Sequence, residues 1–441
     1  MNTADLGLPV DVPSTALFTD QYELTMLQAA LKAGTAERRS VFEVFTRRLP
    51  EGRRYGVVAG TGRVLDAVEN FRFDAGVLRF LRERRILGEE TLGWLAGYRF
   101  SGDIWGYPEG EVYFPGSPIM RVEGSFAECV LLETVILSIL NHDSAIAAAA
   151  SRMSSAAGDR PLIEMGARRT HELAAVAAAR AAYVGGFAST SDLAAGFRYG
   201  IPTVGTSAHA FTLLHDRERD AFQAQVNTMG RGTTLLVDTY DVAEAVRTAV
   251  EVAARSWGPC GSTRGTCCWS RTGCASSWTT WGATGTKIIV TSDLDEYAIA
   301  SLAAAPVDAY GVGTQLVTGS GHPTSAMVYK LVARAESADP GAPLVPVAKK
   351  STGGKVSVGG RKWAARRLDE YGVPEAEVIG TGPVPAGLAD RQLLVELVKG
   401  GEVVAREPLD VPRERHIAAR AGLPLSATQL SRGRRSSPRS T

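Results

Sequence analysis

The chain has 441 residues, of which 45% are hydrophobic and 22% are charged, and its formal net charge at pH 7 is +1. This balance is typical of a soluble globular protein, and it favours neither a nucleic-acid partner nor an acidic membrane surface. No apolar run approaches the roughly 20 residues that a membrane helix needs, and no signal-peptide pattern is recognised, so we expect a cytoplasmic protein without membrane or nucleic-acid partners.

The first 120 residues combine helix and strand patterns. Apolar side chains at helical spacing predict a helix over residues 20–33, and either Thr19 or Asp20 supplies its polar N-cap. Alternating or continuous apolar residues predict strands at 40–46 and 110–114. We therefore expect an α+β sandwich domain over residues 1–120.

From about residue 125 the pattern changes to Ala-rich helices, predicted over 128–150 and 168–184, and then to alternating strands and helices. Such alternation predicts parallel strands, and their spacing favours an α/β barrel over an open sheet. We expect this barrel, with the active site, over residues 121–338. Its strands are predicted within the segments PTVGTSAHA, TTLLVDTYD, TKIIVTSDLDE and VDAYGVGTQL.

Residues 339–441 begin with a stretch rich in Pro, Gly and Lys and continue with short strand-like pieces. Such a segment is either a solvated appendage or a region that folds back. We expect it to pack on the first domain.

The loops that follow the predicted barrel strands carry the residues able to do chemistry, because barrels of this type place their sites there. The Gly-spaced loop at Gly313 and Thr314 could cradle a phosphate with its backbone amides, although a structural turn explains the same pattern. His209 could act as a base or nucleophile near neutral pH, or could merely cap its loop. The full set of such residues is Thr206, His209, Asp238, Asp241, Ser292, Asp293, Gly311, Gly313 and Thr314.

Between Arg255 and Gly282 the composition differs from the rest of the chain. This segment holds four of the five cysteines and four of the seven tryptophans, and no Asp or Glu occurs from Val252 to Ser292. The adjacent Cys267 and Cys268 do not fit the paired spacing of a structural zinc site. A disulfide cluster fits no better, since no signal-peptide pattern is recognised and Cys129 stands alone elsewhere. A polar surface loop does not explain the four tryptophans.

A shifted reading frame explains the segment. When G/C-rich codons are assumed and the last base of each codon is read with the first two of the next, residues from Ser256 become ELGAVRLDSGDLLLVAHRVRQQLDDLG. This text rejoins the visible sequence at Ala283 and contains an acidic loop, RLDSGD, whose two acids fall at Thr263 and Thr266. Read the same way, the basic tail at 436–441 becomes VIPTEY. Paired carboxylates beside a phosphate loop suit a phosphorylated ribose.

With these motifs in order, the chain resembles nicotinate phosphoribosyltransferases, most closely their actinobacterial form. The resemblance runs from about residue 15 to about residue 430, and it is carried by LFTDQYELTM, FEVFTRRLP, EMGARRTHE, GTSAHAF, the shifted-frame RLDSGD and YGVGTQLVTGSG. It implies an irregular TIM-like α/β barrel of the type II phosphoribosyltransferases, with an α/β sandwich domain formed by N-terminal and C-terminal segments. It also implies a homodimer whose site is completed across the interface.

The resemblance further implies an activity, in which nicotinate and 5-phosphoribosyl 1-diphosphate give nicotinate mononucleotide for NAD salvage, with Mg²⁺ and with ATP as co-substrate. His209 would be phosphorylated, Thr206 would contact nicotinate, and Tyr22 would stack on the pyridine ring. Arg168 would pair with the nicotinate carboxylate or a phosphate. Gly313 and Thr314 would hold the 5-phosphate.

Three alternatives remain open: a quinolinate-specific relative, a nicotinamide-specific relative, and an inactive product of a frameshifted gene. The third follows because Thr263 and Thr266 cannot replace two carboxylates. We predict severe impairment of the chain as written.

Overall fold

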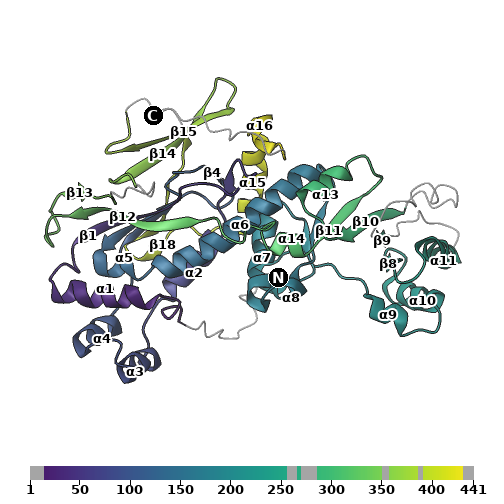
Figure 1. The fold of residues 1–441 in the computed structure, drawn as a ribbon, viewed down its shortest axis with the longest axis horizontal. Coiled ribbons are helices and arrows are strands. Elements are labelled where there is room, and N and C mark those ends of the chain that lie inside the picture. Colours follow the sequence, from purple (N-terminus) through teal and green to yellow (C-terminus); the bar gives the residue numbers. More distant parts are fainter. Residues whose placement is uncertain (1–13, 256–265, 270–285, 350–356, 386–390, 431–441) are drawn as a thin grey trace. The chain divides into compact units, whose positions relative to one another are not determined.

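A computed structural model describes residues 14–255, 266–269, 286–349, 357–385 and 391–430 (Figure 1). The chain divides into two compact units, which are described separately. The first contains the residues up to Ser144 together with Thr324–Ala427, and the second contains Ala145–Pro323. The first unit thus combines N-terminal and C-terminal segments. The domain bounds at residues 120 and 338 stay predictions.

The first unit is organised around a seven-stranded antiparallel sheet in the order β13-β12-β1-β5-β3-β17-β18. Three of its strands come from the N-terminal segment, and the other four follow the second unit in the sequence. A three-stranded sheet, β15-β14-β16, and a two-stranded sheet, β2-β4, complete the β-structure of the described residues. The strands are β1 Arg39–Thr46, β2 Gly56–Val57, β3 Asp103–Gly106, β4 Val112–Tyr113, β5 Met120–Ser125, β12 Met327–Ala335, β13 Leu344–Pro346, β14 Lys362–Leu368, β15 Pro374–Thr381, β16 Arg391–Gln392, β17 Val395–Lys399 and β18 Glu402–Val403.

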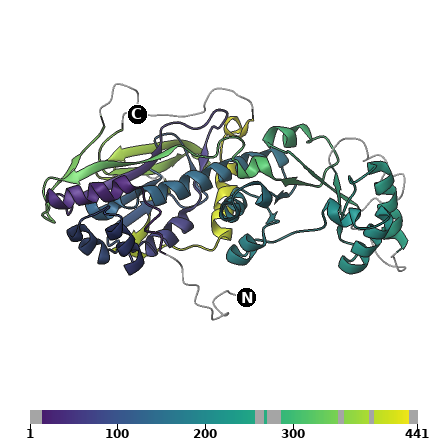
Figure 2. The same cartoon turned by 60° about the horizontal axis from the view of Figure 1, so that its bottom comes forward.

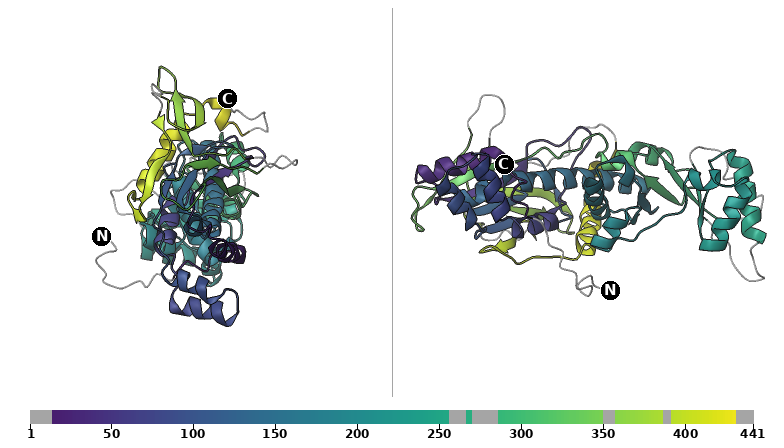
Figure 3. Two further views of the ribbon diagram at one scale, coloured as in Figure 1. Left: turned by 90° about the vertical axis from the view of Figure 1, so that its left-hand side faces the viewer. Right: turned by 90° about the horizontal axis from the view of Figure 1, so that it is seen from below.

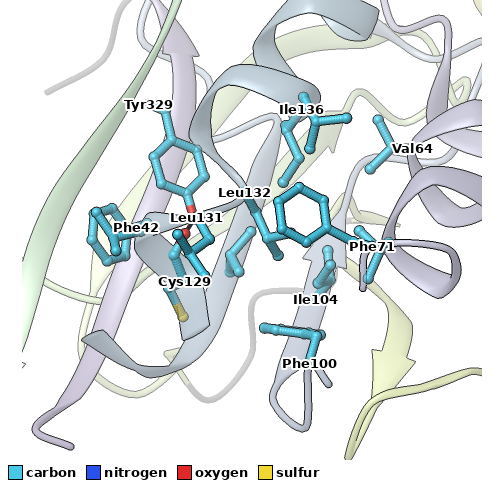
Figure 4. Packing of buried hydrophobic residues seen from close by; sticks show 14 of the residues in the cluster. Phe42, Val64, Phe71, Phe100, Ile104, Cys129, Leu131, Leu132, Ile136 and Tyr329 are labelled. Carbon is cyan, nitrogen blue, oxygen red and sulfur yellow. Dashed lines mark hydrogen bonds between the residues drawn. The ribbon is translucent and has the colours of Figure 1, made fainter. Parts of the chain in front are cut away.

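The central strand β1 is buried on both faces, because successive side chains of a strand point in opposite directions. Phe42 and Val44 belong to the main hydrophobic core, in which the Phe42 ring stacks on Tyr329 at a centroid distance of 4.9 Å. Figure 4 shows this core, with Phe71 reaching toward the helical side chains near it. Glu43 points to the other face, where its carboxylate meets Lys362 of β14 at 2.7 Å. The large sheet is therefore covered on both sides.

Helices cover the core face of the large sheet. α1 begins after Asp20, whose side chain accepts a hydrogen bond from the Tyr22 backbone, so the predicted helix and one of its two predicted caps are confirmed. Figure 2 shows the purple and blue helices beneath the green strands, and the end-on view in Figure 3 places the blue helices opposite the yellow-green strands. The helices of this unit are α1 Gln21–Lys32, α2 Thr61–Glu69, α3 Ala75–Glu83, α4 Glu89–Ala96, α5 Phe126–Val130 and α15 Asp410–Ala421, while α6 Glu133–Ala157 and α16 Leu425–Thr428 cross the boundary between the units.

The second unit contains a parallel six-stranded sheet in the order β7-β6-β11-β10-β9-β8. An isolated parallel bridge joins Thr190 of β7 to Thr203. The strands therefore follow one another around a ring in the same order as in the chain. Among the described residues, no backbone pairing closes this ring between Thr203 and β8. This is the arrangement of an irregular barrel, and it confirms the predicted fold class. The strands are β6 Leu162–Glu164, β7 Ser189–Thr190, β8 Thr234–Leu236, β9 Thr266–Trp269, β10 Lys287–Ser292 and β11 Ala309–Val312.

Between β6 and β8, and between β10 and β11, helices connect these strands, as expected for parallel neighbours. Two predicted helices differ in detail. The helix predicted at 128–150 is divided into α5 and α6, and Ser125 caps α5 in a reciprocal capping box with Glu128. The helix predicted at 168–184 begins only at Glu172. The helices of this unit are α7 Glu172–Val184, α8 Leu193–Tyr199, α9 His209–Leu213, α10 Glu218–Met229, α11 Val242–Arg255, α13 Glu296–Ser301 and α14 Thr314–Val317, with a 3₁₀ turn at Ala167–Arg169.

Within the described residues, no helix combines the length and the apolar character needed to cross a bilayer. The segment predicted to be read out of frame lies outside the described residues, apart from α11's last residue and the backbone of β9. The same holds for the predicted shifted tail at 436–441.

Candidate active site

The carboxyl ends of β6 and β11 lie side by side in the second unit. The Met165 backbone N–H donates to the Val312 carbonyl at 2.8 Å. Gly166 follows, and a Cβ at this position would lie 2.2 Å from Val317 Cγ1 and 3.1 Å from the Gly313 carbonyl oxygen. Only glycine fits there, because real Cβ atoms do not approach neighbours so closely. The two strand-end loops are therefore in direct contact.

These two loops carry three of the predicted site residues. Arg168 is the middle residue of the 3₁₀ turn Ala167–Arg169 and is exposed. Gly313 is the N-cap of α14 and Thr314 is its first residue, and both are half-buried. The structure thus places the exposed guanidinium group of Arg168 and the loop at Gly313 at the same end of the sheet. Guanidinium groups and backbone amides are both donors that suit phosphate or carboxylate oxygens.

Glu164, the last residue of β6, holds the first of these loops. Its carboxylate is buried and accepts hydrogen bonds from the Thr190 hydroxyl, at 2.5 Å, and from the Gly166 backbone. Burial raises the pKa of Glu164, and these hydrogen bonds oppose the shift. Because both oxygens are engaged, we interpret Glu164 as a support for the loop. The sequence analysis did not single it out.

His209, the first residue of α9, faces the end of β8. Its Nδ1 lies 3.1 Å from the Thr239 hydroxyl, and its Nε2 lies 3.9 Å from an oxygen of Asp238. The imidazole is half-exposed, at 52%, whereas the Asp238 side chain is only 21% exposed. A ring held at one nitrogen, open to solvent and beside a carboxylate can accept a phosphoryl group or a proton.

The pairing of His209 with Asp238 and Thr239 could not be read from the sequence alone. Asp238 appeared there only as one of several strand-end acids. The signal available was the run VDTYD directly after a predicted strand, which places polar groups at the strand end. What the sequence lacked was the neighbour, because His209 precedes β8 by 25 residues and reaches it through α9 and α10.

Two predicted site residues remain, Thr206 and Tyr22. Thr206 is exposed in the loop between Thr203 and α9, three residues before His209. Tyr22 belongs to the first unit, on α1, and is 43% exposed. Partial burial, and then the nearby Glu133 carboxylate, raise the pKa of Tyr22 to about 12, so this phenol stays neutral at physiological pH.

Comparison with known proteins decides which family this arrangement belongs to. The family model for the nicotinate phosphoribosyltransferase N-terminal domain matches residues 17–141. The nicotinate phosphoribosyltransferase pncB1 of Mycobacterium tuberculosis is 51% identical over 445 residues, which cover 99% of this chain and 97% of that protein. The chain belongs to the nicotinate phosphoribosyltransferase family. The nicotinate phosphoribosyltransferase of Bacillus subtilis, 36% identical over 81% of this chain and 74% of that protein, is a more distant relative.

The mycobacterial relative also confirms the predicted resemblance to the actinobacterial form of the family. Solved structures support the fold. The human nicotinic acid phosphoribosyltransferase has a TM-score of 0.76 with 23% identity over 93% of this chain and 95% of that chain. A nicotinate-nucleotide pyrophosphorylase from Pyrococcus furiosus scores 0.73 with 21% identity, covering 92% and 96%. Since both proteins share the fold with this chain almost equally, fold alone does not separate these two activities, whereas sequence identity does.

For a nicotinate phosphoribosyltransferase, a metal site is also of interest. In the part of the chain that the structure describes, no cluster of three or more His, Cys, Asp or Glu side chains could hold a metal ion. The two carboxylates of the shifted-frame RLDSGD would stand at Thr263 and Thr266. Position 263 is outside the described residues, and only the backbone is described at position 266. The described residues therefore do not form a protein cage for Mg²⁺.

Proposed function

We propose that the active enzyme is this chain with the shifted-frame text at residues 256–282. It joins nicotinate to 5-phosphoribosyl 1-diphosphate and couples the reaction to ATP hydrolysis, with nicotinate mononucleotide and diphosphate as products. The observation that carries the proposal is the 51% identity to the mycobacterial enzyme across 99% of the chain. A relation of that extent includes every segment in which the site residues lie. The contacts at the ends of β6, β8 and β11 supply the roles of individual residues.

The loop at Gly313 and Thr314 is proposed to bind the 5-phosphate of the sugar. Its backbone can approach an anion closely, since no side chain projects at Gly313. Arg168, on the adjoining loop, is proposed to pair with the nicotinate carboxylate or with a phosphate oxygen. Its planar guanidinium group can donate two parallel hydrogen bonds to either anion. The contact between the two loops at Gly166 supports joint binding of one phosphorylated substrate.

His209 is proposed to accept the terminal phosphoryl group of ATP. A nitrogen lone pair of the imidazole attacks the phosphorus, the bond to the bridging oxygen breaks, and ADP leaves with that electron pair. The Asp238 carboxylate, 3.9 Å from Nε2, stabilises the positive charge that the ring carries during this step. The phosphoryl group adds about −1.5 to −2 charges at neutral pH, judged from other phosphorylated side chains, which would reorder neighbouring loops. Thr206, in the same loop, is proposed to contact nicotinate.

At the sugar, the bond to diphosphate breaks as the pyridine nitrogen approaches, so positive charge develops on the ribose ring. Carboxylates near the ring stabilise this charge. In the chain as written, Thr263 and Thr266 stand where the shifted frame supplies the acids. Mg²⁺ is proposed only as a companion of the substrate diphosphate, since proteins commonly hold it through substrate phosphates and one or two carboxylates. The described residues do not fit a further metal role.

We also propose a homodimer, in which Tyr22 stacks on the pyridine ring in the site of the other subunit. An exposed neutral phenol suits that contact, because it offers a flat apolar face that keeps its proton at physiological pH. A cytoplasmic location is proposed because ATP and the sugar diphosphate are highly charged and do not cross membranes unaided.

The decisive experiment compares two full-length chains: the chain as written, with its sequence verified, and a restored chain in which residues 256–282 carry the shifted-frame text. Each is incubated with 5-phosphoribosyl 1-diphosphate and nicotinate, nicotinamide or quinolinate, with and without ATP, and nucleotide products are separated by chromatography. The restored chain is expected to use nicotinate and to respond to ATP. The chain as written is expected to be at least about 100-fold slower, since one lost electrostatic contact costs about that much.

The alternatives give different outcomes. Preference for nicotinamide, or release of CO₂ from quinolinate, would replace the proposed activity with that of a related enzyme. Equal turnover by both chains would refute the role given to the shifted-frame acids. No product from the restored chain would leave the family assignment in place but contradict the proposed activity. Resequencing the encoding DNA tests the shifted frame directly, because an unbroken frame across 255–282 contradicts it.

A further inference from the structure

The segment after β11 ends in an unusual turn. α14 is followed by Gly319, Ser320 and Gly321, and all three have left-handed backbone angles, with φ values of 63°, 52° and 81°. Glycine adopts this conformation readily, but serine does so only under constraint. The Ser320 backbone N–H donates to the Gln315 carbonyl at 2.6 Å, so the turn closes the end of α14. A left-handed serine in a functional loop indicates that other contacts hold it there.

The Ser320 side chain supplies one such contact. Its hydroxyl donates to an oxygen of Glu296 at 2.8 Å, and Glu296, the first residue of α13, is only 4% exposed. Burial opposes ionisation of this carboxyl, but the hydrogen bonds from Arg152 and Ser320 stabilise the ionised form more strongly. The pKa of Glu296 is therefore lowered. The acceptor is therefore an ionised carboxylate, to which hydrogen bonds are stronger than to a neutral oxygen.

The other oxygen of Glu296 is bound from α6. Arg152 Nε donates to it at 2.9 Å, and the guanidinium group also lies over the Tyr297 ring, 5.8 Å from its centroid. Arg152 is itself 6% exposed, so this ion pair is shielded from water. Glu296 thus joins three parts of the second unit: α6, α13 and the turn that follows α14.

We propose that Glu296 and Ser320 are positioning residues for the phosphate-binding loop at Gly313 and Thr314. The hydroxyl contact fixes the turn that closes α14, and α14 begins at the loop itself, only four residues long. Release of Ser320 would let this short helix and the amides at its start move away from the geometry that receives a phosphate. The identity of the ligand rests on the proposed function, whereas the contact between Glu296 and Ser320 does not.

The test measures binding of ribose 5-phosphate to the full chain by calorimetry at constant ionic strength. Ser320→Ala removes the hydroxyl and keeps the side-chain Cβ, while Ser320→Gly removes the hydroxyl and relieves the left-handed strain. Both variants are expected to bind ribose 5-phosphate about tenfold more weakly, the effect of losing one hydrogen bond to a charged group. Ser301→Ala is the matched control on α13, because the Ser301 hydroxyl bonds only to its own helix, at the Ala298 carbonyl. It should bind like the parent.

Two further measurements distinguish a positioning role in phosphate binding from a general loss of structure. Nicotinate affinity and the midpoint of thermal unfolding should change little in the Ser320 variants, whereas general misfolding would alter both. Glu296→Gln should weaken ribose 5-phosphate binding as well, and the combination Glu296→Gln with Ser320→Ala should be no weaker than the worse single variant, since both act through one contact.

Wild-type-like binding by Ser320→Gly, or additive losses in the double variant, would overturn the proposal. A parent chain that does not bind ribose 5-phosphate would overturn it too. Product formation from nicotinate is measured separately on the restored chain, which carries the shifted-frame text at residues 256–282, and it alone decides the proposed function. A restored chain that binds ribose 5-phosphate through this contact and makes no nucleotide would retain the inference and lose the activity.

Discussion

Lys362→Met tests whether a buried charge pair holds β14, from the C-terminal segment, to β1 of the N-terminal segment. Lys362 of β14 lies 2.7 Å from Glu43 of β1, and the two side chains are 7% and 2% exposed. Removing the ammonium group leaves a buried carboxylate without its partner, which costs about 3–5 kcal/mol. Burial already raises the pKa of Glu43, and Lys362 and then Arg121 oppose that shift. The substitution is therefore expected to raise this pKa further.

The pH dependence follows from the direction of that shift. In the variant, native Glu43 holds its proton at pH values where the unfolded chain, near its ordinary 4.5, has released it. The loss of stability should therefore grow as pH rises above about 4.5. Urea unfolding followed by tryptophan fluorescence at pH 5 and pH 8 measures it. Lys330→Met is the matched control, because Lys330 is 39% exposed and lies 3.4 Å from Glu133, so its loss should cost at most about 1 kcal/mol.

A double variant tests whether the lost stability comes from the unpaired charge of Glu43. Glu43→Gln combined with Lys362→Met removes both charges, and it should recover most of the lost stability, since a neutral pair has no uncompensated charge. A Lys362→Met penalty below about 1 kcal/mol, or one equal at both pH values, would refute the reasoning.

Three further predictions concern single residues. Asp238→Asn should slow the formation of acid-labile phosphate on His209 by about 10- to 100-fold with ribose 5-phosphate binding unchanged, and an unchanged phosphorylation rate would contradict the assigned role. Phe71→Ala should lower the free energy of unfolding by about 3–5 kcal/mol, because this ring is 1% exposed within the main core, and a cost below about 1 kcal/mol in urea would be inconsistent with that packing. Burial raises the pKa of Glu23 to about 7, so the stability that the protonated carboxyl contributes is present below about pH 4.5 and is lost as pH rises through 7. Glu23→Gln should therefore remove a pH dependence of about 3 kcal/mol in the free energy of unfolding. Parallel plots of stability against pH for parent and variant would contradict this role of Glu23.

Local features of the fold were predictable from the sequence, because they depend on neighbours in the chain. The cap at Asp20 fixed the start of α1, and the apolar run at 40–46 gave β1. The start of α5 at Phe126 had a visible signal, namely Ser125 followed three residues later by Glu128, the pattern of a capping box. Arg168 was wrongly included in a helix, since its run of helix-forming residues concealed a 3₁₀ turn at a strand end.

Pairings between distant residues were not predictable from one sequence. Glu43 and Lys362 are 319 positions apart, and nothing in the local pattern of either strand indicates the other. The same holds for the contact of Ser320 with Glu296 across 24 positions. In the candidate site, the residue types and strand-end positions were readable, whereas their partners, such as Asp238 beside His209, depended on how parallel strands are arranged around the ring.

The arrangement of the second unit explains how a chain with an altered active-site segment can retain its fold. β9 pairs in parallel with β8 on one side and β10 on the other, and these ladders use only backbone groups. A sequence in the wrong frame can satisfy such ladders as long as it permits an extended backbone. The strand-end carboxylates that the chemistry requires are side-chain groups, and Thr263 and Thr266 cannot supply them. We therefore expect binding of ribose 5-phosphate at the intact β11 loop to survive in the chain as written, while nucleotide formation does not, a separation that the two assays proposed above measure on one preparation.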